Sequence, residues 1–150
     1  MIQRAFSYVF EVADPESTIP KIELRPIGLT SFDVFGLTFE SVLLRHGRGF
    51  VYGYRFAGSA YLTDHSEIPE ETEAKLHGMD VLFIDALRHK PHPTHTSLSR
   101  ALRHVEELKP KRAFFTHISH DLPHEQTQRT LPHNVCLAYD GLKITLGDAR

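Results

Sequence analysis

The stretch Ser59-Ala60-Tyr61-Leu62-Thr63-Asp64-His65 stands at the centre of the predicted fold. Its first residues predict a short buried strand, and the strand ends abruptly at the carboxylate of Asp64. Strand ends of this kind present catalytic and metal-binding groups to a cleft at the edge of a sheet. Asp64 is therefore the first candidate for a catalytic residue.

Two other predicted strands end in histidine. Residues 39–44 form an apolar segment that runs out at Arg45-His46, and residues 113–116 are followed directly by His117. Zinc, manganese and iron all accept imidazole and carboxylate ligands, and a two-metal hydrolase needs one group that bridges the ions. We predict His46, Asp64 and His117 as metal ligands, held by a rigid sheet.

A plainer interpretation of the same residues stays open. Asp64 would then form a turn with Ser66 or cap the segment that begins at Pro69, and the two histidines would be ordinary loop residues.

Length and composition indicate one ordinary globular domain. The chain has 150 residues, of which 41% are hydrophobic and 24% charged, and these fractions are typical of soluble proteins. The net charge of −2 gives no reason to expect nucleic acid or an anionic membrane as a partner. No apolar run approaches the roughly 20 residues that span a bilayer, and the N-terminus lacks the apolar core of a signal peptide. We expect a cytoplasmic protein, with the lone Cys136 as a small core residue.

The pattern of apolar residues changes near Pro69. Before it we expect a helix end within residues 1–10, a loop at 14–17, and strands at 21–26, 32–35, 37–44, 50–56 and 60–63. After it we expect helices at 69–78, 98–108 and 125–130 and strands at 81–84, 113–116, 135–138 and 142–146. Alternation of strand and helix implies right-handed crossovers and a largely parallel sheet covered by helices, which is an α/β fold.

Histidine is unusually frequent, with eleven residues, and two further clusters could carry chemistry. In the loop from His89 to His95, His95 is the better candidate, because it lies just before a helix capped by Thr96 or Ser97, where it could bind a phosphate or protonate a leaving group. For His89 and His92 we favour a solvent-exposed loop.

The second cluster follows the strand at 113–116. Consecutive residues cannot all point at one ion, so we assign His117 as the metal ligand. His120 would then either face the substrate or support one of the metal-binding residues. For Asp85, which also follows an apolar run, we favour acceptance of hydrogen bonds from backbone donors over a supporting role at the metal site.

Several motifs occur in the same order as in a known superfamily. The motifs are Tyr61-Leu62-Thr63-Asp64, Asp85-Ala86-Leu87-Arg88, Pro91-His92-Pro93-Thr94-His95, Thr116-His117-Ile118-Ser119-His120-Asp121 and Ala138-Tyr139-Asp140-Gly141. With these motifs the chain resembles the metallo-β-lactamase-fold hydrolases, and within them the branch of the phosphoribosyl cyclic phosphodiesterase of phosphonate breakdown.

The resemblance implies a fold and a reaction. The fold would be part of an αββα sandwich with a mixed sheet, and the site would hold two divalent ions, zinc or manganese. His46 would bind the first metal, Asp64 would bridge both, and His117 would bind the second. His95 would face the scissile phosphate, and a metal-bridging hydroxide would attack a small-molecule phosphodiester.

One hallmark of this family is missing from the sequence. The His-x-His-x-Asp-His motif supplies most of the other ligands, yet the first histidine here is His46. We therefore expect residues 1–150 to form a single metallo-β-lactamase-like domain without its N-terminal part. The alternatives are that a partner supplies the rest, or that the chain has lost activity and works by association, for example as a homo-oligomer. An unrelated α/β binding module is a third alternative.

Overall fold

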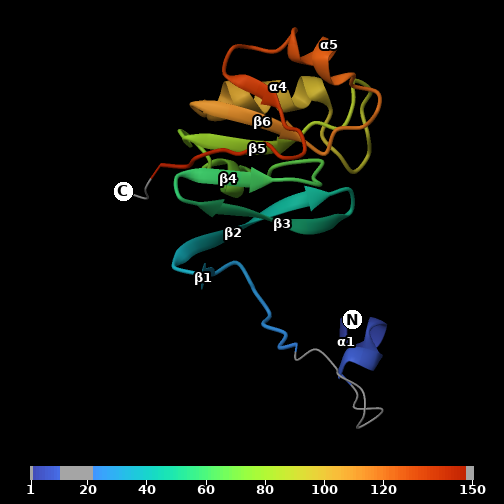
Figure 1. Ribbon diagram of the computed structural model, residues 1–150, viewed down its shortest axis with the longest axis vertical. Coiled ribbons are helices and arrows are strands. Elements are labelled where there is room, and N and C mark those ends of the chain that lie inside the picture. Colours follow the sequence, from blue (N-terminus) through green and yellow to red (C-terminus); the bar gives the residue numbers. More distant parts are fainter. Residues whose placement is uncertain (1, 11–21, 148–150) are drawn as a thin grey trace.

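A computed structural model describes residues 2–10 and 22–147, and its centre is one mixed sheet with strands in the order β1-β2-β3-β4-β5-β6-β7 (Figure 1). Strands β1 to β4 form an antiparallel meander, whereas β4 to β7 are parallel. The predicted mixed sheet with helices is confirmed. The strands are β1 (Ser31–Val34), β2 (Leu37–His46), β3 (Gly49–Phe56), β4 (Ser59–Leu62), β5 (Val81–Asp85), β6 (Arg112–Thr116) and β7 (Val135–Leu137).

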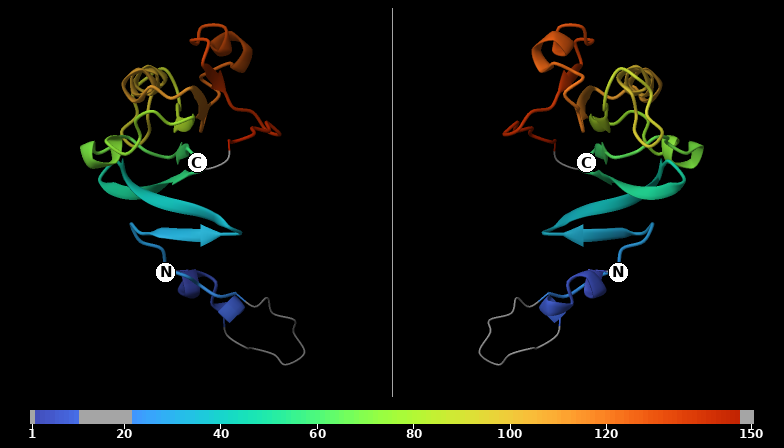
Figure 2. Two further views of the ribbon diagram at one scale, coloured as in Figure 1. Left: turned by 90° about the vertical axis from the view of Figure 1, so that its left-hand side faces the viewer. Right: turned by 90° about the vertical axis from the view of Figure 1, so that its right-hand side faces the viewer.

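The described helices are short apart from one. They are α1 (Ile2–Ala5), α2 (Ser7–Phe10), α3 (Glu70–Glu73), α4 (Leu98–Leu108) and α5 (His124–Gln128). Helix α4 begins where the sequence predicted, because the Ser97 hydroxyl accepts a hydrogen bond from the Arg100 amide at 3.4 Å. Its residues Leu98, Ala101 and Leu108 are buried in the core. Figure 2 shows α3 and α4 on the same side of the sheet.

The two faces of the sheet differ in composition. The face toward α4 carries small and aliphatic residues together with Phe115, which form the buried core. The opposite face carries a row of aromatic residues that are neighbours across the strands, and we call this the aromatic face: Phe39, Tyr54, Tyr61, Phe83 and Phe114. Tyr61 keeps 38% of its surface exposed. The molecule therefore buries one face of its sheet more completely than the other.

Three sequence expectations differ from the structure. Residues 22–26 are exposed and form no strand, and residues 142–146 also form none. Both segments alternate apolar and polar side chains, but alternation makes a strand only where a neighbouring backbone offers a register, and no ladder is formed by either segment. The predicted helix at 69–78 is regular only in α3 and continues as turns to Gly78.

Other expectations near the chain ends are met in part. The helix end expected within residues 1–10 is present as α1 and α2, which a turn at Phe6 separates. The loop predicted at 14–17 and residue 21 lie outside the described residues. Cys136 lies in β7 but is only partly buried, so it is not a core residue. Among the described residues, no helix is long and apolar enough to cross a membrane.

Candidate metal centre

Strand direction brings the predicted site residues to one edge of the sheet. Because β2 and β4 are each antiparallel to β3, they run in the same direction, and β5 and β6 are parallel to β4. All four strands therefore end at the same edge. His46 ends β2, Asp85 ends β5, and Asp64 and His117 follow β4 and β6 within two residues.

Asp64 lies at the centre of the candidate site. Its Oδ1 atom lies 3.4 Å from His46 Nε2, 3.2 Å from His95 Nδ1 and 3.8 Å from His117 Nε2. Its side chain is 48% exposed, so the cluster is open to solvent on one side. The structure thus brings together His46, Asp64, His95 and His117, which are four of the five residues singled out in the sequence.

Two of these residues have an unusual backbone conformation. Asp64 has φ of 61° and His117 has φ of 56°, which lie in the left-handed region that residues other than glycine rarely adopt. The three other non-glycine residues with positive φ in the described chain are Phe35, Ala57 and Lys109, which lie in turns or at the end of α4. Left-handed residues at strand ends indicate stored strain, which is commonly found at functional sites.

Hydrogen bonds hold the segment after Asp64 against the end of β2. The Ser66 amide donates to the Arg45 carbonyl at 2.7 Å, and the Arg45 amide donates to the Glu67 carbonyl at 3.0 Å. The Ser66 hydroxyl accepts from the Gly47 amide at 3.0 Å. These bonds fix His46 beside Asp64.

Two backbone hydrogen bonds join the two ends of the loop that carries His95. The Leu87 amide donates to the Thr96 carbonyl and the Leu98 amide to the Arg88 carbonyl, both at 2.9 Å. The His95 ring lies 4.8 Å from the His117 ring and 5.2 Å from the His46 ring, between centroids. Burial, followed by the charge of His117, lowers the pKa of His95.

Asp85 is completely buried, and its Oδ2 atom lies 3.6 Å from His95 Nδ1. Its Oδ2 atom accepts hydrogen bonds from the backbone amides of His65 and Thr96, as the sequence analysis favoured. Burial raises the pKa of Asp85 to about 6, although nearby His117 and the two amides act in the opposite direction. No sequence pattern indicates this burial beyond an acid directly after four apolar residues.

Two sets of side chains in the described chain could each hold an ion. The first consists of His46, Asp64 and His95, and the second of Asp85, His95 and His117. Both sets include His95, which sequence analysis had placed on the substrate side. His120 belongs to neither set; its side chain is 96% exposed, and its Nε2 lies 3.6 Å from Asp121.

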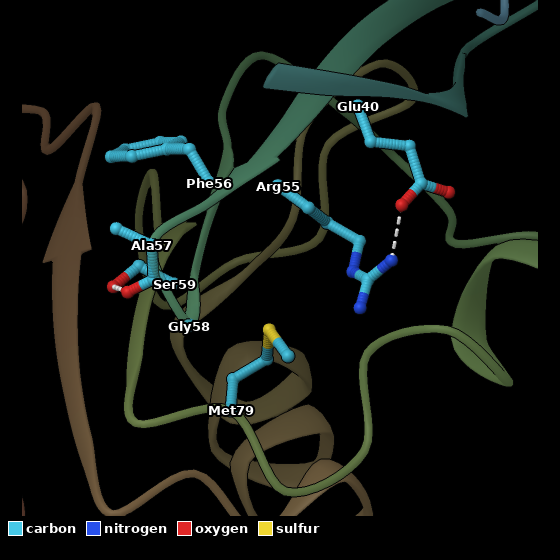
Figure 3. Close-up of a pocket in the computed structure, with 7 residues that line it drawn as sticks. All are labelled: Glu40, Arg55, Phe56, Ala57, Gly58, Ser59 and Met79. Atoms are coloured by element: carbon cyan, nitrogen blue, oxygen red, sulfur yellow. Dashed lines mark hydrogen bonds and ion pairs between the residues drawn. The ribbon is translucent and has the colours of Figure 1, made fainter. Parts of the chain in front are cut away.

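A separate pocket lies at the other end of β4. It is lined by Glu40, Arg55, Phe56, Ala57, Gly58, Ser59 and Met79 and contains none of the predicted site residues. Figure 3 shows the Arg55 guanidinium paired with Glu40 and facing Met79. Ser59 begins β4 whereas Asp64 follows its end, so this pocket is not part of the candidate metal centre.

Comparison with known sequences identifies the family. Residues 2–118 match the sequence model of the beta-lactamase superfamily domain. The chain belongs to this family. It has the metallo-β-lactamase fold and is related to the PhnP branch, as the sequence motifs indicated.

Two solved structures are similar to this chain, the second in fold alone. A crystal structure of a new diphosphatase from the PhnP family is 43% identical, superposes with a TM-score of 0.88 and matches 99% of this chain but 55% of its own. The Zn²⁺-bound PqqB from Methylobacterium extorquens is 18% identical, with a TM-score of 0.58 over 80% of this chain and 51% of its own.

A curated protein gives a shorter match. An octanoyltransferase of Porphyromonas gingivalis is 32% identical over 119 residues, which are 78% of this chain and 24% of that protein. The chain thus spans about half of the similar diphosphatase and about a quarter of the transferase.

Proposed function

We propose that this chain takes part in metal-dependent hydrolysis of a small-molecule phosphodiester. The observation that carries the proposal is the position of Asp64 Oδ1, which lies within 3.8 Å of an imidazole nitrogen from each of three histidines. These histidines come from three separate segments of the chain. Such convergence is unexpected for ordinary loop residues and suits side chains that share ions.

The side chains present fit divalent metal ions. Imidazole nitrogens and carboxylate oxygens are ligands for zinc and manganese alike. Asp85 Oδ1 is buried without a hydrogen-bond partner among the described residues, so this oxygen has a free acceptor position at the site. In the proposed arrangement His46, Asp64 and His117 would hold the ions, with Asp64 shared between them. Bound ions would supply an activated water at neutral pH and neutralise charge on the phosphate oxygens.

The other residues act on the substrate in this proposal. His95 lies beside Asp64 with 16% of its side chain exposed, so one edge of its ring can reach a bound phosphate. Because burial lowers its pKa, protonated His95 is a stronger acid than free histidine and suits donation of a proton to the leaving oxygen. His120 is exposed on the loop after His117 and would contact the outer part of the substrate.

One similar solved structure supports phosphoryl chemistry. The PhnP-family structure with 43% identity is that of a diphosphatase, an enzyme that cleaves a phosphorus–oxygen bond. A diphosphate bond is therefore the natural second substrate to test beside a phosphodiester.

Metal content and hydrolysis of bis(4-nitrophenyl) phosphate test the proposal in one preparation. The purified chain is loaded with Zn²⁺ or Mn²⁺, freed of unbound metal and assayed, with a diphosphate diester in parallel. We expect Asp64→Asn and His46→Gln to lower metal affinity at least about tenfold, as removal of groups that hold a metal does. The exposed Asp33→Asn and His133→Gln are matched controls and should change nothing.

Two results would contradict the proposal. One is a wild-type chain that binds no divalent ion, and the other is an Asp64→Asn variant with unchanged metal affinity. Preference for the diphosphate substrate would keep the metal centre and change only the substrate class.

A second candidate function is association without catalysis, and the aromatic face favours it. Partly exposed aromatic patches of this kind are typical of interfaces, and the chain spans 55% of the similar diphosphatase. Under this alternative, light scattering would show an oligomer that Tyr61→Lys dissociates, and no phosphodiester would be hydrolysed. A wild-type monomer would exclude self-association.

A further inference from the structure

Asp85 is a buried charged group that belongs to one candidate ligand set, and the proposed function gives it no role as a metal ligand or in substrate binding. It ends β5, the strand between β4 and β6, and its side chain has no exposed surface. Burial of a carboxylate costs free energy unless hydrogen bonds compensate for the lost water. The partners of Asp85 therefore indicate its role.

One oxygen of Asp85 joins two loops. Oδ2 lies 3.2 Å from the His65 amide nitrogen and 3.4 Å from the Thr96 amide nitrogen, and both amides donate to it. His65 follows Asp64 and Thr96 follows His95, so each amide is one residue from a side chain of the candidate metal centre. The Thr96 hydroxyl closes the connection by donating to the His65 carbonyl at 2.9 Å.

We propose that Asp85 is a positioning residue that sets the separation of Asp64 and His95. A single carboxylate oxygen holds the backbone of both loops, and the Thr96 hydroxyl ties them to each other. The 3.2 Å contact between Asp64 Oδ1 and His95 Nδ1 is the consequence. The effect on metal binding rests on the proposed function, whereas the effect on the backbone does not.

The chemistry of the acceptor explains why a carboxylate is present. An ionised oxygen accepts stronger hydrogen bonds than a carbonyl and can serve two donors at once. An apolar residue at this position would leave the amides of His65 and Thr96 buried without partners. Asparagine would keep an oxygen for both amides, and its nitrogen would replace Oδ1, which has no hydrogen-bond partner among the described residues.

This difference between side chains gives the test variants. Asp85→Ala removes the acceptor, and Asp85→Asn keeps a weaker one. Thr96→Val removes only the hydroxyl that donates to His65. Thr72→Val is its matched control, because the Thr72 hydroxyl is also buried and donates to a distant carbonyl, that of Leu43 at 2.7 Å.

The first measurement is amide hydrogen exchange of the metal-free chain, resolved at single residues. We expect the His65 and Thr96 amides to exchange at least about tenfold faster in Asp85→Ala. In Asp85→Asn they should stay close to wild type. Amides in the middle of β6 report global stability and correct for it.

The second measurement is the affinity for Co²⁺ or Zn²⁺. We expect a loss of about 10- to 100-fold in Asp85→Ala, as for other groups that orient ligands. Asp85→Asn should lose much less. Thr96→Val should bind metal more weakly than Thr72→Val at equal stability, which a merely structural hydroxyl would not do.

Three outcomes would overturn the proposal. One is unchanged exchange of the two amides in Asp85→Ala, and another is faster exchange with unchanged metal affinity. The third is an Asp85→Asn variant that loses metal while its amides stay protected, because Asp85 would then be a ligand. A wild-type chain that binds no metal would contradict the proposed function instead, and the exchange measurement would still decide whether Asp85 holds the two loops.

Discussion

Asp64 and His117 follow β4 and β6, the two strands on either side of β5, and both have a left-handed backbone conformation; their side chains lie 3.8 Å apart between Oδ1 and Nε2. For a residue with a Cβ this conformation raises the free energy by about 1 kcal/mol or more, whereas glycine adopts it without strain. The chain thus gives up stability at both positions and gains convergence of two side chains. This cost can be measured.

We predict that His117→Gly is more stable than His117→Ala by about 1 kcal/mol in the metal-free protein, because only glycine adopts φ of 56° without strain. The free energy of unfolding is measured in urea with a chelator present. At Thr116, the last residue of β6, the order should reverse, and Thr116→Ala should be more stable than Thr116→Gly. Equal stability of the two His117 variants would show that the left-handed backbone stores no strain.

Gly47 provides a second test, because its loop contacts the loop of His95. It has φ of 58°, and a Cβ at this position would lie 2.9 Å from Thr94 Cγ2. We predict that Gly47→Ala lowers the free energy of unfolding by about 1–2 kcal/mol and weakens metal binding. Gly78→Ala is the control, because Gly78 has φ of 68° and open space around it, and so reports backbone strain alone.

The double variant Gly47→Ala/Thr94→Ser separates the steric contact from the backbone strain. Serine lacks the Cγ2 methyl group but keeps the hydroxyl, so part of the lost stability should return. A strictly additive double variant would show that the contact does not contribute.

The separate roles of His95 and the metal ligands predict different kinetics, on the basis of the proposed function. His95→Ala should keep its bound metal, and its kcat should fall about 10²–10⁴-fold for an alkyl leaving group that needs a proton. The fall should be smaller for 4-nitrophenolate, which leaves without protonation. Loss of metal from His95→Ala would instead make His95 a ligand, since it belongs to both candidate ligand sets.

The sequence predicted which residues lie at this edge of the sheet better than it predicted the contacts between them. Apolar runs that end in Asp64, Asp85 or His117 reveal strand ends, and the order of helices and strands gives the parallel direction that brings those ends together. What holds the loops depends on tertiary contacts. The amides bound by Asp85, and the fit of Gly47 against Thr94, join residues that no periodicity relates.

The two strands that were predicted but do not form have the same explanation. Residues 22–26 and 142–146 alternate as a strand should, but pairing depends on an available edge of the sheet, which local sequence does not specify. Strand β7, which lies at one edge of the sheet, has only three residues. A strand prediction needs the partner as well as the pattern.

Two buried groups behind the site predict opposite dependences of stability on pH. Burial, followed by the charges of His104 and Arg100, lowers the pKa of His65 from 6.5 to about 3, so its contribution is present above pH 6.5 and is lost as the pH falls. Burial raises the pKa of Asp85 from 3.8 to about 6, so its contribution is present below pH 3.8 and is lost as the pH rises through 6. Between pH 4 and 6 the two effects oppose each other in the wild type.

We therefore predict that removing either group exposes the slope of the other in the metal-free protein. In Asp85→Asn the free energy of unfolding should rise between pH 4 and 6, with up to about 1.4 kcal/mol per pH unit from His65. In His65→Gln it should fall over the same range because Asp85 remains. Urea unfolding with a chelator measures both slopes, and the exposed His133→Gln should follow the wild type. Slopes of the same sign in the two variants would contradict the assignment of His65 and Asp85 as opposing groups.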